Sequence, residues 1–253
     1  MTDKSLKHVI IGSGVVGQST GQLLESHGED VTYYDTNHET ITKLQKRGKS
    51  ATEVLPSEWD IVWICTHEKH TASVIPTRHS KDSIIIIRCT VEPSFFDRFD
   101  KYDLDHIVHI PEFLRESNSI EDTFQPDRVI IGSNNSLFSN KIIDLMKKMY
   151  TCPIIVVPHA ISAYIKLISN AWLSTQISFW NEVHMMMGDS KYKQVTANTV
   201  ALDHRISKYG TIMTGTPFTG KCLPKDIDHI INMSGSDFFK QVKKTNEMCK
   251  NEM

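Results

Sequence analysis

The chain has 253 residues, a formal net charge of -2 and an apolar fraction of 40%. This length is enough for one or two domains with a sizeable core. The weak net charge excludes the strongly basic composition of many nucleic-acid and membrane-surface proteins, so we expect neither kind of partner.

The cysteines are odd in number and include no close pair. They are Cys65, Cys89, Cys152, Cys222 and Cys249. We therefore expect neither a disulfide framework nor a metal site. The sequence shows no signal peptide and no apolar run of membrane-spanning length, which together predict a cytoplasmic location.

The first residues predict a dinucleotide-binding unit. An apolar run from Lys7 reaches Gly12-Ser13-Gly14-Val15-Val16-Gly17, and a helical pattern follows. A strand, a glycine turn and a helix in this order form the context in which G-x-G-x-x-G binds a pyrophosphate. The first glycine allows the tight turn, the second allows close approach of the ligand, and the third allows helix and strand to pack. The phosphates would lie on the helix N-terminus. The predicted cofactor contacts in this loop are Gly12, Gly14, Val15, Val16 and Gly17.

A second predicted strand, residues 30–34, ends at Asp35, which lies 18 residues after Gly17. A carboxylate here can bind both hydroxyls of an adenosine ribose and would repel a 2′-phosphate. This position therefore favours NAD over NADP.

Further apolar runs predict five more strands, at residues 60–66, 83–90, 105–109, 128–132 and 153–157. Buried strands that alternate with helical patterns indicate a parallel sheet covered on both faces. Thr66, Thr90 and Glu112 follow strand ends, at the edge where such sheets bind ligands. The predicted fold class is α/β: a Rossmann-type parallel sheet domain over 1–157, followed by a helical central domain over 158–253.

Residues 159–187 contain no glycine or proline and predict one long helix. It is apolar over much of its circumference, so we expect it to be buried, for example against a second subunit. Lys166 and Asn170 share one face of it and could polarise and orient a substrate oxygen; a solvated stripe is the alternative. Residues 191–206 predict another helix, 209–219 a loop, and the stretch after Asp226 mostly helix.

The segment Gly220-Lys221-Cys222-Leu223-Pro224-Lys225-Asp226 offers a candidate nucleophile in a loop. Nearby cations favour the reactive thiolate form of a cysteine. Gly220 would let the backbone approach a ligand closely. Taken alone, the segment favours a surface turn that holds an incidental cysteine, because a lone cysteine carries little information.

With these motifs in order, the sequence resembles the UDP-glucose/GDP-mannose dehydrogenases, which are nucleotide-sugar 6-dehydrogenases. Five segments carry the resemblance. They are 12–17 with Asp35; Cys89-Thr90-Val91; 111–116 continuing through 120–122 to 126–132; 166–170 with 177–179 and 181–182; and 220–226.

The resemblance implies oxidation of a sugar C6 hydroxyl to a carboxylate in two NAD-dependent steps. Cys222 would attack the C6 aldehyde and pass through a thiohemiacetal and a thioester. Lys166 and Asn170 would stabilise the developing oxyanion. Glu112 would serve the hydrolysis or orient Lys166, and Thr90 with Asp226 would hold a water for proton transfer.

The family pattern also implies cofactor and substrate contacts. Thr66 and Thr90 join the glycine loop and Asp35 as cofactor-binding positions. Arg205 matches an arginine that members lend to a neighbouring subunit, which implies a homodimer built on the long helix. The implied substrate contacts are Glu112, Phe113, Leu114, Glu116, Lys166, Asn170, Arg205 and Gly220.

The sequence departs from the family at several positions. Ile110 stands where asparagine is usual, Ala163 where glutamate is usual, and Lys221 is an added cation beside Cys222. Only 27 residues follow Asp226. We therefore expect a shortened form that lacks the C-terminal UDP-binding domain, unless a partner chain supplies it or the chain is a fragment. A missing wall predicts a weaker or different substrate.

Two other interpretations remain open at this stage. One is a two-electron dehydrogenase of the 3-hydroxyacid type, which uses a similar fold and a lysine and asparagine four residues apart but needs no Cys222. The other is a non-catalytic NAD-binding relative that requires a partner. The number of NADH molecules formed per substrate separates the three.

Overall fold

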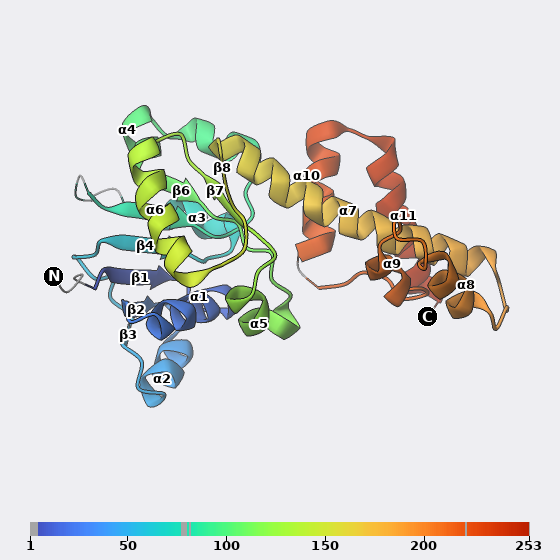
Figure 1. Ribbon diagram of the computed structural model, residues 1–253, viewed down its shortest axis with the longest axis horizontal. Helices are drawn as coiled ribbons and strands as arrows, with labels where there is room; N and C mark the ends of the chain where they lie inside the picture. The colour runs from blue at the N-terminus through green and yellow to red at the C-terminus, as the bar shows by residue number, and fades with distance from the viewer. Residues whose placement is uncertain (1–4, 77–79, 81, 221, 253) are drawn as a thin grey trace. The chain divides into compact units, whose positions relative to one another are not determined.

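The computed structural model describes residues 5–76, 80, 82–220 and 222–252 (Figure 1). The chain divides into two compact units, residues 1–166 and residues 167–253. The boundary lies within the long helix α7 (His159–Met186). Each unit is described by itself below.

The first unit is built on one eight-stranded sheet in the order β3-β2-β1-β4-β5-β6-β7-β8. The strands are β1 (Lys7–Ile11), β2 (Asp30–Tyr34), β3 (Ala51–Thr52), β4 (Ile61–Ile64), β5 (Ile84–Ile87), β6 (Ile107–His109), β7 (Val129–Gly132) and β8 (Ile154–Val157). All neighbouring pairs are parallel except β6 and β7, which pair antiparallel at His109 and Gly132.

Helices cover both faces of this sheet (Figure 1). They are α1 (Val15–Ser26), α2 (His38–Lys46), α3 (Glu68–Val74), α4 (Lys101–His106), α5 (Ser119–Phe124) and α6 (Ser136–Met149), with short 3₁₀ helices η1 (Pro93–Arg98) and η2 (Glu116–Asn118). Adjacent strand residues enter different cores: Ile10 belongs to one buried cluster and Ile11 to the other. Alternation of this kind buries both faces of the strands, which confirms the predicted fold class.

The sequence prediction was wrong in two details of the sheet. The two-residue strand β3 was not predicted, because Ala51 and Thr52 form no apolar run. The predicted strand 105–109 is shorter, since residues to His106 belong to α4 and Asp100 caps that helix by accepting from the Asp103 N–H.

The second unit is helical. Beyond its part of α7 it contains α8 (Lys193–Val200), α9 (Lys208–Ile212), α10 (Cys222–Ser234) and α11 (Asp237–Glu252). Its core combines Leu167, Ala171, Ile177, Phe218, Ile227, Ile230 and Val242. The predicted long helix is confirmed in extent. The helix predicted over 191–206 is shorter, and the predicted loop 209–219 includes most of α9, whose first turn Ser207 caps through the Tyr209 N–H.

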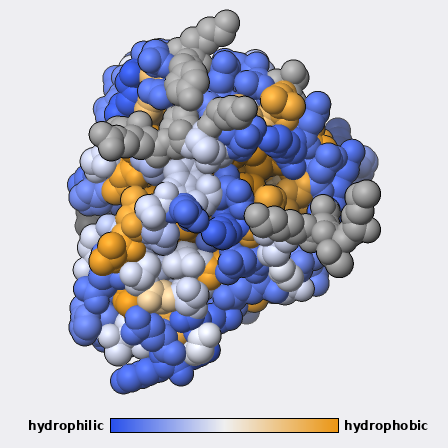
Figure 2. Space-filling view, turned by 90° about the vertical axis from the view of Figure 1, so that its left-hand side faces the viewer, coloured by the Kyte–Doolittle hydropathy of each residue, from blue (hydrophilic) through white to orange (hydrophobic). Residues whose placement is uncertain are grey.

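One face of α7 is not buried in this chain. Ile168, Trp172 and Phe179 are exposed, Trp172 by 60%. Their spacing of four and seven residues places them along one side of the helix. On the face of the molecule shown in Figure 2, apolar side chains form separate areas with hydrophilic ones between them. In the described part of the chain, no helix combines the length and the apolar character needed to cross a membrane.

Buried histidines predict a loss of stability in weak acid. His109 hydrogen-bonds through Nδ1 with Ser162 Oγ (2.7 Å) and through Nε2 with the Cys89 carbonyl (3.1 Å). Its burial lowers its pKa to about 3. An unfolded histidine titrates near pH 6.5, so below that pH the unfolded chain binds a proton that the native chain does not. This contribution to stability is therefore present above pH 6.5 and is lost as the pH falls toward 3.

We expect His109→Gln to reduce this dependence. Between pH 6.5 and 5 the free energy of unfolding of the variant should change less steeply, by up to about 1.4 kcal/mol per pH unit. Urea unfolding of both proteins across this window measures the two slopes. Equal slopes would contradict the assignment of a buried neutral imidazole to His109.

Candidate functional site

The glycine loop has the geometry that a bound pyrophosphate needs. Gly12 has a φ of +91°, and a Cβ on Gly17 would lie 2.1 Å from the Gly12 carbonyl oxygen. Only glycine therefore fits at these two positions. Gly14 is exposed, and a Cβ there would meet nothing within 4 Å. It is the N-cap of α1, and no described side chain caps that helix, so the N–H groups of its first turn are open to an anion.

Asp35 is held against this loop. Its Oδ2 accepts a hydrogen bond from the Ser13 N–H (2.8 Å), and its Oδ1 accepts one from the Asn37 N–H (2.9 Å). A carboxylate has further lone pairs for hydroxyl donors. The loop and Asp35 together thus fit a dinucleotide whose adenosine ribose carries no 2′-phosphate.

Mutation can separate the roles of Gly14 and Gly17 in this loop. We expect Gly17→Ala to lower the free energy of unfolding by about 1–3 kcal/mol, because its Cβ would overlap backbone. Gly14→Ala should leave stability nearly unchanged and weaken NAD binding, because its Cβ points into open space. Thermal unfolding with and without NAD measures both effects. Equal destabilisation by the two substitutions would contradict this division of roles.

Thr66 and Thr90 follow neighbouring strands. Thr66 comes after β4 and touches the glycine loop, since a Cβ on Gly12 would lie 2.9 Å from the Thr66 nitrogen. Thr90 is buried between β5 and η1. These positions lie at the carboxyl ends of parallel strands, where open sheets bind ligands.

Glu112 and Lys166 form a buried ion pair in the first unit. Lys166 Nζ lies 3.6 Å from Glu112 Oε1, with side-chain exposures of 3% and 9%. Glu112 Oε2 also accepts from the Leu114 N–H (2.9 Å), which fixes the carboxylate. Burial strengthens the attraction between the two charges and makes the loss of either partner costly.

Phe113 lies between two cations. Lys166 Nζ is 5.1 Å and Arg128 Cζ 4.5 Å from the centre of its ring. The negative face of an aromatic ring attracts such groups. Sequence reasoning did not find the part played by Arg128, because no local spacing relates it to Phe113.

The segment after Phe113 is pinned by Arg115. Its guanidinium donates to both carboxylate oxygens of Asp122 (2.9 and 2.6 Å), and its backbone N–H donates to Oδ2. Hydrogen bonds from Arg115 lower the pKa of Asp122. Glu116, the next residue, begins η2 and is exposed.

A second group of predicted residues converges in the second unit. Asn170 Nδ2 donates to Asp226 Oδ2 (2.6 Å), and Asp226 is fully buried. Lys225 Nζ lies 3.4 Å from Asp226 Oδ1, an oxygen that makes no described hydrogen bond. A buried polar atom of this kind commonly holds a water.

Cys222 was predicted in a loop, but it is the first residue of α10. It is exposed and precedes Asp226 by one helical turn, so the two share a face. The partial positive charge of a helix N-terminus favours a thiolate. Gly220 has a φ of +80° and open space at its Cβ position. Lys221 lies outside the described residues.

Among the described contacts, none links Arg205 to the other predicted site residues. It is exposed in the segment after α8, and its Nε donates to Asp203 Oδ1 (3.0 Å). The geometry therefore yields three groups: the glycine loop with Asp35, the Glu112–Lys166 pair with Phe113, and Cys222 with Asn170 and Asp226.

The sequence matches a family of known enzymes. Residues 56–152 match the NAD binding domain of the UDP-glucose/GDP-mannose dehydrogenase family, and residues 161–248 match its central domain. NAD is therefore the cofactor to which the first match points.

Named relatives agree. The chain is 28% identical over 266 residues to the UDP-glucose 6-dehydrogenase of Rickettsia bellii, covering 86% of this chain and 60% of the relative. It is 26% identical over 287 residues to that of Bacillus subtilis, covering 94% of this chain and 65% of the relative. The chain thus spans about 60% of the length of the first of these relatives.

Solved structures show the same fold. A UDP-glucose dehydrogenase from Pyrobaculum islandicum superimposes with a TM-score of 0.79 at 22% identity, covering 98% of this chain and 69% of that one. A UDP-D-ManNAc dehydrogenase from Pyrococcus horikoshii gives 0.80 at 17% identity, covering 96% and 69%. With both domain matches in the family's order, the chain belongs to the UDP-glucose/GDP-mannose dehydrogenase family.

Proposed function

We propose that the chain is an NAD-dependent oxidoreductase that oxidises the C6 alcohol of a nucleotide sugar, such as UDP-glucose, to the carboxylate. The observation that supports this proposal is the position of Cys222 one turn before Asp226 on α10, together with the hydrogen bond that the Asn170 amide donates to the buried Asp226 carboxylate. A two-electron dehydrogenase has no use for a nucleophilic thiol, whereas oxidation to the acid requires a covalent aldehyde adduct.

The cofactor half of the proposal assigns roles to the first group. The first turn of α1 would hold the pyrophosphate, and Asp35 would accept from the adenosine ribose, with Thr66 and Thr90 beside them. When bound, NAD supplies the hydride acceptor for each of the two oxidations.

The first oxidation converts the C6 alcohol to the aldehyde: one C6 hydrogen would leave as hydride to NAD, and the hydroxyl proton would pass to water. In our proposal Lys166 and Asn170, one turn apart on α7, donate to the C6 oxygen and stabilise its developing negative charge. Glu112 orients the Lys166 ammonium through its 3.6 Å contact. Phe113 offers that ammonium an apolar, electron-rich wall.

The second oxidation requires Cys222. Its sulfur bonds to the aldehyde carbon and a proton passes to the former carbonyl oxygen, which gives a thiohemiacetal. Loss of the remaining C6 hydrogen as hydride, and of the hydroxyl proton to water, leaves a thioester on Cys222. Water then adds to the thioester carbon, the C–S bond breaks, and the thiol and a carboxylic acid are released.

We assign this water to the Asp226 carboxylate. Asp226 Oδ1 is buried without a described hydrogen bond, and Asn170 holds the opposite oxygen in place. Thr90 and Glu112, on the first unit, are proposed as further catalytic residues. The Asp226 carboxylate has one oxygen held by Asn170 and one that is ion-paired with Lys225 (3.4 Å) but makes no described hydrogen bond, so it can position a water and accept its proton.

We further propose that the substrate is contacted by Phe113, Leu114, Glu116, Gly220 and Arg205.

Residues 1–157 would form the NAD-binding domain and residues 158–253 the central domain. We propose that the protein acts in the cytoplasm. We also propose a homodimer through the exposed apolar side of α7, because Ile168, Trp172 and Phe179 are exposed along that side. Light scattering after size exclusion tests the dimer.

A panel assay tests the activity. The purified chain is mixed with NAD and with UDP-, GDP- and simple sugars, and absorbance at 340 nm reports NADH. The proposal predicts turnover with a nucleotide sugar. The panel also includes 3-hydroxy acids, and NADH formed only from these would replace the proposal with the two-electron alternative. NAD binding without turnover would favour a non-catalytic relative.

A further inference from the structure

A second acid, Glu53, follows the edge strand β3 at the position next to Asp35. Strands β2 and β3 pair in parallel with Tyr34 opposite Thr52, and the Asp35 N–H donates to the Thr52 carbonyl (3.4 Å). Asp35 and Glu53 are thus the next residues beyond the last paired position on two adjacent strands. Neighbouring parallel strands lie about 4.8 Å apart, so these two positions are close.

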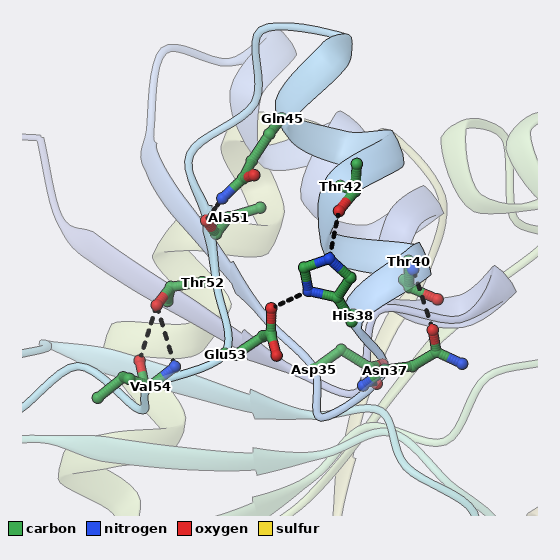
Figure 3. Close-up of polar contacts among 10 residues, drawn as sticks. All are labelled: Asp35, Asn37, His38, Thr40, Thr42, Gln45, Ala51, Thr52, Glu53 and Val54. Atoms are coloured by element: carbon green, nitrogen blue, oxygen red, sulfur yellow. Dashed lines mark hydrogen bonds and ion pairs between the residues drawn. The ribbon is translucent and has the colours of Figure 1, made fainter.

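Glu53 is held in place by a histidine on α2. His38 Nδ1 lies 2.6 Å from Glu53 Oε1, and His38 Nε2 lies 3.4 Å from the Thr42 hydroxyl. Figure 3 shows His38 and Glu53 facing each other beside the segment that carries Asp35. Both side chains are exposed, and the contact links the first residue of α2 to the residue that follows β3.

The backbone around Glu53 is also fixed. Gln45 Nε2 on α2 donates to the Ala51 carbonyl (2.8 Å), and the Thr52 hydroxyl accepts from the Val54 N–H (3.0 Å) (Figure 3). These bonds anchor the residues on both sides of Glu53. The backbone that carries Glu53 is therefore held, and its carboxylate contacts His38.

We infer that Glu53, positioned by His38, is a second determinant of NAD over NADP. This inference rests on the NAD site of the proposed function. NADP differs from NAD by a phosphate on the ribose 2′-oxygen, the group that Asp35 would contact. A second carboxylate at the adjacent position adds repulsion against that phosphate and leaves an uncharged hydroxyl almost unaffected.

Other acids nearby do not have this arrangement. Glu39 lies in the first turn of α2 but pairs with Lys43 of the same helix (2.6 Å), which offsets its charge. Asp35 accepts from two backbone N–H groups, and Glu53 adds a second negative charge beside it. Replacing Glu53 would also release the His38 imidazole, a potential phosphate donor.

The test measures dissociation constants of NAD and NADP by calorimetry on the intact chain. Glu53→Gln should tighten NADP binding about tenfold and change NAD binding less than about twofold. The gain should shrink at 1 M salt, which a purely structural change would not do. Glu58→Gln is the matched control. Glu58 pairs with Lys7 (3.2 Å), the first residue of β1, and so lies at the amino ends of the strands, whereas Asp35 and Glu53 lie at their carboxyl ends.

A double variant separates the two contributions. Glu53→Gln combined with His38→Ala should keep only part of the gain, because the freed imidazole is then removed. If the wild type binds NAD but Glu53→Gln changes the NADP affinity no more than Glu58→Gln does, the inference is overturned and the NAD site stands. If the wild type binds neither dinucleotide, both the inference and the proposed function are wrong.

Discussion

Replacing Cys222 with serine is expected to abolish carboxylate formation while NAD binding stays unchanged. A serine hydroxyl at the start of α10 is not ionised near neutral pH, whereas a thiol there is assisted by the helix N-terminus. We expect the rate of acid formation to fall by a factor on the order of 10³ or more. The first oxidation does not use the thiol, so an aldehyde should accumulate and be captured by a hydrazine probe.

Cys152→Ser provides the control for this experiment. Cys152 is a half-buried cysteine of the first unit that precedes β8, and no catalytic or binding role is assigned to it. It should retain the activity of the wild type. Acid formation by Cys222→Ser at the rate of the control would remove the cysteine from the mechanism.

Replacing Asn170 with aspartate is expected to have the largest effect on stability. The new carboxylate would lie where the Asn170 amide now donates to Asp226 Oδ2 at 2.6 Å, in a fully buried site. Two buried carboxylates at this distance repel, and the hydrogen bond is lost. We expect the free energy of unfolding at pH 7 to fall by about 3–5 kcal/mol.

The pH dependence gives this prediction a direction. One of the two carboxyls should bind a proton in the native state at a pH where both are ionised in the unfolded chain. The native variant then holds more protons, so its stability should fall as the pH rises and recover as the pH drops toward 5. Asn198→Asp, an exposed position on α8, should change stability by less than about 0.5 kcal/mol. Urea unfolding compares the two, and equal losses would contradict the buried contact.

Local patterns predicted the fold well. Apolar runs predicted seven of the strands, and the uninterrupted stretch after Pro158 predicted α7 almost to the residue. The glycine loop was predictable because its three glycines have a fixed spacing between a predicted strand and a predicted helix. The strand β3 was not, since its pairing with β2 depends on tertiary contacts and not on its composition.

The site was predictable residue by residue but not as an arrangement. Asn170 and Asp226 are 56 residues apart, and nothing in the sequence states that they share a hydrogen bond. Cys222 was placed in a loop because Pro224 suggested one. Proline is tolerated in the first turn of a helix, where its missing N–H has no partner, and α10 begins in this way.

The acidic partner of Asp35 illustrates the same limit. The Asp35 position follows from a spacing after the glycine loop, whereas Glu53 becomes significant only once β3 is paired with β2. His38 and Glu53 are 15 residues apart and carry no motif. Contacts across a sheet edge therefore have to come from the structure.

The most direct test of the central claim counts the NADH molecules formed per molecule of nucleotide sugar consumed. The chain is given excess NAD and a limiting amount of the sugar that the panel identifies, and the reaction is run to completion. The proposed thiohemiacetal and thioester chemistry predicts two NADH for each sugar converted to its acid. A value of one, with an aldehyde or ketone as product, would contradict it and assign the chain to two-electron chemistry.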